Sequence, residues 1–205
     1  LLLSPNTLTT SQQVIKVPAE SRYDVLSGFE PILLVSNQPL LLVANPRTGF
    51  KSMADMIQAA KSGKPVAYAT PGSGSPMHIV AEWLGREAGV KFVHVPYKGT
   101  APAVADVVAG HVDTAWLTPG VVSQYMAEGR LVPLAVADPT RSSRAPNVPT
   151  LVEAGYKDIV SPAWQGLYAP KGTPPEVIRT LNTHVNEILK MPDVVAKIHG
   201  AGANP

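Results

Sequence analysis

The middle of the chain alternates between short apolar runs and longer segments whose apolar residues recur at helical spacing. Short apolar runs predict buried strands, and the longer segments predict helices. The predicted strands are 65–69, 92–95, 112–117 and 131–137, and the predicted helices are 53–61, 77–88, 101–109 and a segment that ends at Gly129. Ser52 is the expected cap of the first helix, and glycine follows the others. This alternation predicts an α/β fold with a mostly parallel sheet.

Further elements are predicted toward the two ends of the chain. Apolar runs at 1–3, 29–35, 40–44 and 164–169 predict strands. Thr150 and Thr173 each precede a glutamate by three residues, a capping-box pattern that predicts a short helix ending at Gly155 and a long helix after Thr173. The long helix carries an apolar stripe predicted to be core, formed by Val177, Ile178, Leu181, Val185, Ile188 and Leu189.

The segment from Tyr68 to His78 carries the strongest functional signal. A strand ends in a loop of small residues, and Ser75 and Pro76 then suit the N-cap and first position of a helix. Backbone N–H groups, hydroxyls and the positive end of a helix dipole together suit an anion. An ordinary capped turn between strand and helix is the alternative. The candidate ligand residues of this loop are Thr70, Gly72, Ser73, Gly74 and Ser75.

Two better-known phosphate signatures do not fit this loop. No lysine follows the glycines, as a P-loop requires, and the third glycine of a dinucleotide fingerprint is replaced by Met77. A small carboxylate therefore fits better than a nucleotide.

Three loops are predicted to leave the carboxyl ends of neighbouring strands, at 70–75, 96–100 and 118–120. Ligands of open parallel sheets bind at that edge, so the convergence of these loops predicts a binding cleft. Four more residues are candidates, and three of them have a structural alternative. His78 either touches the ligand or is a structural histidine, Lys98 either neutralises an anion or is a solvated surface lysine, Thr118 belongs to the third loop, and Trp164 either faces the cleft or is buried.

Composition excludes several other functions. The net charge of the 205 residues is only +2 and the basic residues are scattered, which argues against nucleic-acid binding. No apolar run reaches membrane-spanning length. The chain has no cysteine, and its five histidines lack ligand spacing, so no metal site is expected. No nucleophile elbow and no carboxylate pair appears, so we expect neither an enzyme nor a cofactor.

Six segments resemble, in the same order, motifs of the Bug-type substrate-binding proteins, the extracytoplasmic receptors of tripartite tricarboxylate transporters. The likeness covers essentially the whole chain, and its most recognisable part is Val-His-Val-Pro-Tyr-Lys-Gly-Thr-Ala-Pro-Ala at 93–103. The other matching segments are 68–78, 110–113, 134–137, 148–155 and 167–174.

This resemblance implies an α/β fold of the two-lobed type II periplasmic-binding-protein (Venus flytrap) kind. Lobe 1 would comprise residues 1–44 and 138–205, and lobe 2 residues 45–137. Family members carry an additional amino-terminal strand and helix, so the first lobe is expected to be incomplete. The family's polar loop after its second strand matches Ser4-Pro5-Asn6-Thr7, which implies that Ser4 and Asn6 contact the ligand.

The implied function is that of a monomeric periplasmic receptor without a cofactor. It would bind a small organic carboxylate between its lobes and deliver it to the membrane permease subunits of a tripartite tricarboxylate transporter. A ligand-sensing module that signals to a partner remains an alternative from the same fold. An enzyme acting on an anionic substrate is a further alternative, although no nucleophile or acid–base pair lies beside the loops.

Overall fold

The computed structural model describes the chain except for residues 15, 17 and 19–21, and it divides into two compact units. Unit 1 comprises Leu1–Gln38 and Ala163–Pro205, and unit 2 comprises Pro39–Pro162. The predicted lobes had different boundaries, because residues 39–44 and 138–162 belong to unit 2. The reason is pairing: strand β3 (Leu41–Ala44) lies within the sheet of unit 2, and Thr150 forms a bridge with Val136 of that sheet.

Unit 2 contains a five-stranded sheet with the order β5-β4-β6-β3-β7. The other strands are β4 (Ala67–Thr70), β5 (Val93–Pro96), β6 (Thr114–Leu117) and β7 (Val132–Val136). Strand β4 pairs in parallel with β5 and β6, whereas β3 is antiparallel to both of its neighbours. All five strands match predicted apolar runs, and the mostly parallel sheet is as expected.

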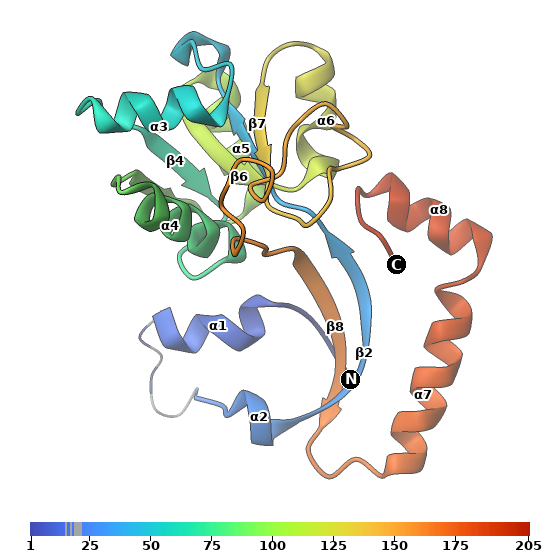
Figure 1. Cartoon of the computed structure of the whole chain (residues 1–205). Coiled ribbons are helices and arrows are strands. Elements are labelled where there is room, and N and C mark those ends of the chain that lie inside the picture. The colour runs from blue at the N-terminus through green and yellow to red at the C-terminus, as the bar shows by residue number, and fades with distance from the viewer. Residues whose placement is uncertain (15, 17, 19–21) are drawn as a thin grey trace. The chain divides into compact units, whose positions relative to one another are not determined.

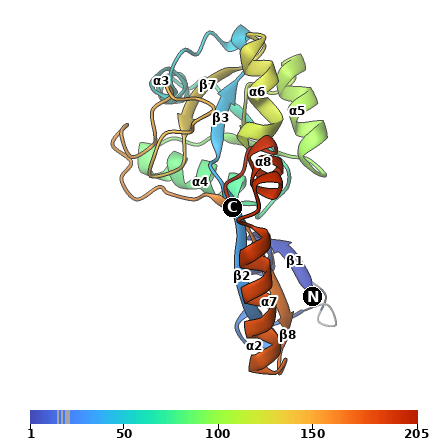
Figure 2. The ribbon, with the colours of Figure 1, turned by 90° about the vertical axis from the view of Figure 1, so that its right-hand side faces the viewer.

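Helices cover both faces of this sheet. Helices α3 (Met53–Lys61) and α4 (Pro76–Ala88) lie on one face, and α5 (Thr100–Ala109) and α6 (Pro119–Ala127) lie on the other (Figures 1 and 2). A short 3-10 helix at Pro46–Thr48 precedes α3. No helix among the described residues is both long enough and apolar enough to cross a membrane.

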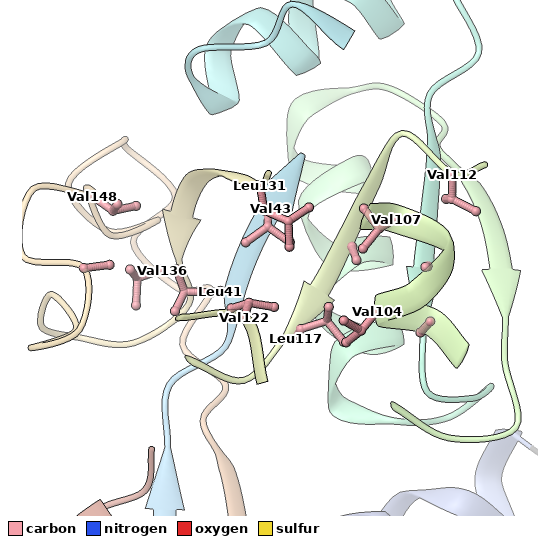
Figure 3. Close-up of a cluster of buried hydrophobic side chains, with 14 residues drawn as sticks. Leu41, Val43, Val104, Val107, Val112, Leu117, Val122, Leu131, Val136 and Val148 are labelled. Atoms are coloured by element: carbon pink, nitrogen blue, oxygen red, sulfur yellow. The ribbon is translucent and has the colours of Figure 1, made fainter. Parts of the chain in front are cut away.

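Alternate residues of the strands supply the two halves of the core. On the α5 and α6 side, Leu41, Val43 and Leu117 pack in one cluster with Val107 and Val122 (Figure 3). On the opposite side, the largest buried side chains are Trp116 and Tyr68, at 1% and 2% exposed. This period of two is what a sheet covered on both faces requires.

Unit 1 contains a three-stranded antiparallel sheet with the order β1-β8-β2. Its strands are β1 (Leu2–Pro5), β8 (Ala163–Pro170) and β2 (Phe29–Gln38), and its helices are α1 (Thr7–Val14), α2 (Val25–Gly28), α7 (Pro175–Ile188) and α8 (Pro192–Gly200). The segment predicted as a polar loop at 4–7 is therefore divided between the end of β1 and the start of α1.

The first predicted capping box forms without a helix, and the second does not form although the long helix predicted after Thr173 is present. Thr150 and Glu153 do form both reciprocal hydrogen bonds, at 3.0 and 2.8 Å, but the chain there makes turns and no helix. Helix α7 begins after Pro174, and its cap has no side-chain hydrogen bond, because Thr173 Oγ1 donates to the carbonyl of Pro170 at 2.7 Å instead.

The apolar stripe of α7 was predicted as core, but no residue of this helix is buried. Val177 and Ile188 are 41% and 47% exposed. Helix α7 packs against β2, where Asn182 Nδ2 donates to the carbonyl of Ile32 at 2.7 Å. A single small sheet shields only one side of a helix, so part of the stripe stays in contact with solvent.

Candidate anion-binding site

Strand β4 leads through the loop at 70–75 into helix α4, as the sequence predicted. Ser75 is the N-cap, and its Oγ accepts from the backbone N–H of His78 at 3.3 Å. Pro76 occupies the first helical position. Gly74 has a φ of 77°, a conformation that costs little only for glycine. The loop therefore places the amino end of α4 at the carboxyl edge of the sheet.

Hydroxyl groups close the loop on itself around the carbonyl oxygen of Gly72. Ser75 Oγ donates to this oxygen at 2.7 Å, and Thr70 Oγ1 donates to it at 3.2 Å. Both hydroxyl protons are therefore used within the loop. Thr70 and Ser75 shape the loop, and their protons are not available to a ligand in this conformation.

Ser73 differs from the other two hydroxyl residues. It is exposed, and neither its hydroxyl nor its backbone N–H has a hydrogen-bond partner among the described residues. The backbone N–H groups of Gly72 and Met77 are also without an acceptor in the described part of the chain. These donors, next to the positive end of the α4 dipole, are what an anion can use.

The loop at 96–100 is bound directly to this first loop. Tyr97 N–H donates to the carbonyl of Thr70 at 3.0 Å, and Gly99 N–H donates to that of Pro71 at 2.9 Å. The Tyr97 hydroxyl donates to Asp106 at 2.6 Å, and burial together with this bond raises the pKa of Tyr97 to about 12. Lys98 is therefore held on an anchored loop beside the first one, and its side chain is exposed.

Thr118 lies where β6 ends and α6 begins. It is the N-cap residue of α6, it is half-buried, and its side chain makes no capping hydrogen bond. It shares the sheet edge with the two joined loops, since β6 is the neighbour of β4.

The three remaining candidates belong to unit 1. The backbone N–H of Asn6 donates to the carbonyl of Trp164 at 3.0 Å, so these two residues are neighbours. Ser4 lies on β1, and its hydroxyl donates to the carbonyl of Pro5 at 3.3 Å. Asn6 is 9% exposed, and Trp164 is half-buried. The predicted site residues thus form one group in unit 2 and a smaller one in unit 1.

Sequence reasoning missed a stack of rings behind the loop. Tyr68 and His94 are register partners on β4 and β5, with ring centroids 4.9 Å apart, and His78 from α4 stacks on His94 at 4.0 Å. The Tyr68 hydroxyl also donates to Glu82 of α4 at 2.5 Å. The signal was available in principle, because parallel register puts His94 beside Tyr68 on the face that α4 covers.

His94 stays neutral in this environment. Its burial, and then the neighbouring His78, lower the pKa of His94 to about 4. Within the described residues no group of three or more His, Cys, Asp or Glu side chains is placed to hold a metal ion.

We expect acid to destabilise unit 2 through His94. An unfolded histidine binds a proton near pH 6.5, so between pH 6.5 and 4 the unfolded state binds more protons than the folded state. The stabilisation is therefore complete above pH 6.5 and is lost as the pH falls toward 4. We expect a loss of about 1–2 kcal/mol, because solvent screens part of the effect at a half-buried ring. Urea unfolding at a series of pH values measures it.

His94→Gln is the matched variant for this measurement, because it keeps a side-chain N–H donor but does not titrate. The variant should show a flatter stability profile between pH 7 and 4 than the native chain. Equal slopes would show that His94 is not the responsible group.

Two clefts lie elsewhere in unit 2. One, of about 470 Å³, lies between α3, β7 and residues 147–156. The other, of about 690 Å³, is lined by residues that include Lys64, Lys91, Glu82 and His94. Neither cleft includes a residue of the 70–75 loop.

Comparisons with known proteins agree with this description. The family model described as "Tripartite tricarboxylate transporter family receptor" (TctC) matches residues 5–205. Protein BugT of Bordetella pertussis is 36% identical over 185 residues, which are 89% of this chain and 56% of BugT. A UPF0065 protein of Pseudomonas sp. strain P51 is 34% identical over 190 residues, 91% of this chain and 55% of the relative. The chain thus spans about half the length of these relatives.

Solved structures show the same fold. Rpa4515 of R. palustris with adipate superposes with a TM-score of 0.87 at 28% identity, over 99% of this chain and 68% of that one. MatC of Rhodopseudomonas palustris with bound malate superposes with a TM-score of 0.84 at 28% identity, over 98% of this chain and 68% of MatC. The periplasmic binding protein BugD superposes with a TM-score of 0.85 at 29% identity, over 99% of this chain and 67% of BugD. The predicted resemblance to Bug-type proteins and the predicted periplasmic-binding-protein fold are confirmed.

Proposed function

Because the chain belongs to the TctC family of tripartite tricarboxylate transporter receptors, we propose that it binds a small organic carboxylate through the loop at 70–75. The proposal rests on four donors at the start of α4 that have no acceptor within the described part of the chain, namely the Ser73 hydroxyl and the N–H groups of Gly72, Ser73 and Met77. Charge-assisted hydrogen bonds to a carboxylate are stronger than neutral ones, so a few such donors suffice.

The charge around the loop indicates how recognition would work. Lys98 is the only cationic side chain of the two joined loops, and neither loop contains an acidic residue. Neutral donors would therefore supply most of the specificity, and Lys98 would contribute longer-range attraction that salt weakens. The ligands named for two similar structures, adipate and malate, are both dicarboxylates, which supports a ligand of this class.

The biological role that we propose is delivery of this ligand to the permease subunits of a tripartite transporter in the periplasm. The family description supports this role. The same binding event would also serve a sensing module, and Ser4, Asn6 and Trp164 of unit 1 remain proposed contacts on the strength of the resemblance. The family and its solved relatives are binding proteins, which argues against an enzyme. Co-purification of the chain with permease subunits from membranes supports delivery over sensing.

Calorimetric titration tests the binding proposal. We expect adipate or malate to bind with measurable heat, and adipamide, which has the length of adipate without its charge, to bind at least about tenfold more weakly. Added salt should weaken carboxylate binding modestly. Absence of heat with both dicarboxylates, or equal binding of adipamide, would contradict the proposal.

A further inference from the structure

His78 holds the far end of the 70–75 loop through one nitrogen. The backbone N–H of Gly74 donates to His78 Nδ1 at 3.2 Å. This bond needs a lone pair on Nδ1, so the neutral ring carries its proton on Nε2. The same Gly74 has a φ of 77°, a conformation that the loop must keep in order to present the neighbouring amides.

His94 holds the near end of the loop. Its Nε2 lies 2.7 Å from Thr70 Oγ1. When the Thr70 hydroxyl donates to the carbonyl of Gly72, His94 Nε2 is the donor in this pair, and in the other tautomer of His94 it accepts the Thr70 proton. Both ends of the loop therefore contact a histidine, and the centroids of the two stacked rings are 4.0 Å apart.

We propose that the stacked His78–His94 pair positions the 70–75 loop for its carboxylate ligand, and that protonation of His78 on Nδ1 breaks its hydrogen bond with the Gly74 N–H and weakens binding. This inference rests on the proposed function. In the protonated ring, Nδ1–H faces the N–H of Gly74, so two donors oppose each other and the hydrogen bond is lost. The like charge of a second proton on His94 is disfavoured at this separation.

The titratable and charged groups that face the two rings determine whether each histidine can take up a proton. Tyr68 faces His94 from β4, Glu82 from α4 bonds to Tyr68, and Lys64 and Lys91 line the same cleft as Glu82 and His94. Burial and His78 hold the pKa of His94 at about 4, so His94 stays neutral above pH 5. A change in the loop between pH 8 and 5 is therefore not caused by His94. The attraction between an imidazolium and the ligand opposes the effect, and solvent screens part of it because the His78 ring is only half-buried.

Nitrogen-15 NMR of the full chain tests the positioning directly. We expect the Gly74 amide resonance to move between pH 8 and 5 in the native chain and to stay fixed in His78→Asn. Asparagine places its Oδ1 near the position of Nδ1 and accepts the same bond without titrating. His184→Asn on α7 is the control for histidine removal, because this residue lies in the other unit. An equal pH shift of Gly74 in His78→Asn would overturn the proposal.

Adipate affinity at the two pH values tests the functional consequence. From pH 8 to 5 the native chain should lose about fivefold more affinity than His78→Asn, which corresponds to one neutral hydrogen bond. The comparison cancels protonation of adipate itself, since both proteins meet the same ligand. A native affinity that rises or falls in parallel with that of the variant would overturn the proposal. If neither adipate nor malate binds at any pH, the proposed function fails, and the Gly74 titration still decides the positioning role.

Discussion

Replacing Leu41 with alanine is expected to lower the free energy of unfolding of unit 2 by about 2–5 kcal/mol. Leu41 is fully buried on strand β3, which lies between β6 and β7. Its side chain belongs to the cluster that also contains Leu117 and Val136 (Figure 3). Truncation removes buried apolar surface and leaves a cavity that two paired neighbouring strands prevent from closing. Urea unfolding followed by circular dichroism measures the loss.

Leu34→Ala is the matched control, since it makes the same change on a strand at a site that is 54% exposed. We expect this variant to lose less than about 1 kcal/mol, because little apolar surface leaves solvent there on folding. Similar losses in both variants would contradict the assignment of Leu41 to the structural core of unit 2.

Local sequence signals predicted the helices of unit 2 well, because the interactions that begin them are local. Ser52 and Asp55 form the reciprocal capping box of α3, and Ser75 caps α4. Each signal needs only three or four consecutive residues to be satisfied. The strands followed from apolar runs for a related reason, since most strand residues of a sheet covered on both faces are apolar.

Signals that depend on distant partners failed. The stripe of α7 has the spacing of a core helix, but burial requires a second layer, which the spacing cannot reveal. Thr150 and Glu153 make a complete capping box without a helix, because Thr150 itself bridges to Val136 and the residues from Leu151 to Gly155 form turns. The boundaries of the two compact units also differ from those of the predicted lobes, because β3 pairs with β6, which is far from it in the sequence.

The position of the 70–75 loop was predicted correctly, but its internal hydrogen bonds were not. The sequence placed a candidate anion loop at the end of β4, and it assigned equal roles to three hydroxyls. The structure separates them, because the hydroxyls of Thr70 and Ser75 donate to Gly72, and of the three only the Ser73 hydroxyl has no partner among the described residues. The stack of His78 on His94 could not be found by spacing along the chain, since it depends on the register of β4 with β5.

Ser73→Ala is expected to weaken adipate binding by about 10- to 100-fold, the loss of one hydrogen bond to a charged group. The Ser73 side chain is exposed and has no partner among the described residues, so its removal should leave the free energy of unfolding unchanged within about 0.5 kcal/mol. Calorimetry measures the affinity, and urea unfolding measures the stability. A ligand-specific loss without a stability loss is the signature of a contact residue.

Ser75→Ala is the informative comparison, because the same substitution two residues away should have the opposite profile. The Ser75 hydroxyl caps α4 and bonds to Gly72, so its loss should cost about 1 kcal/mol of stability. The affinity for adipate should then fall only because the loop is distorted, and it should fall less than in Ser73→Ala. Unchanged adipate affinity in Ser73→Ala would remove this hydroxyl from the site. A stability loss in Ser73→Ala as large as in Ser75→Ala would make Ser73 a structural residue, and the unpaired amides at the start of α4 would then be the remaining donors for the carboxylate.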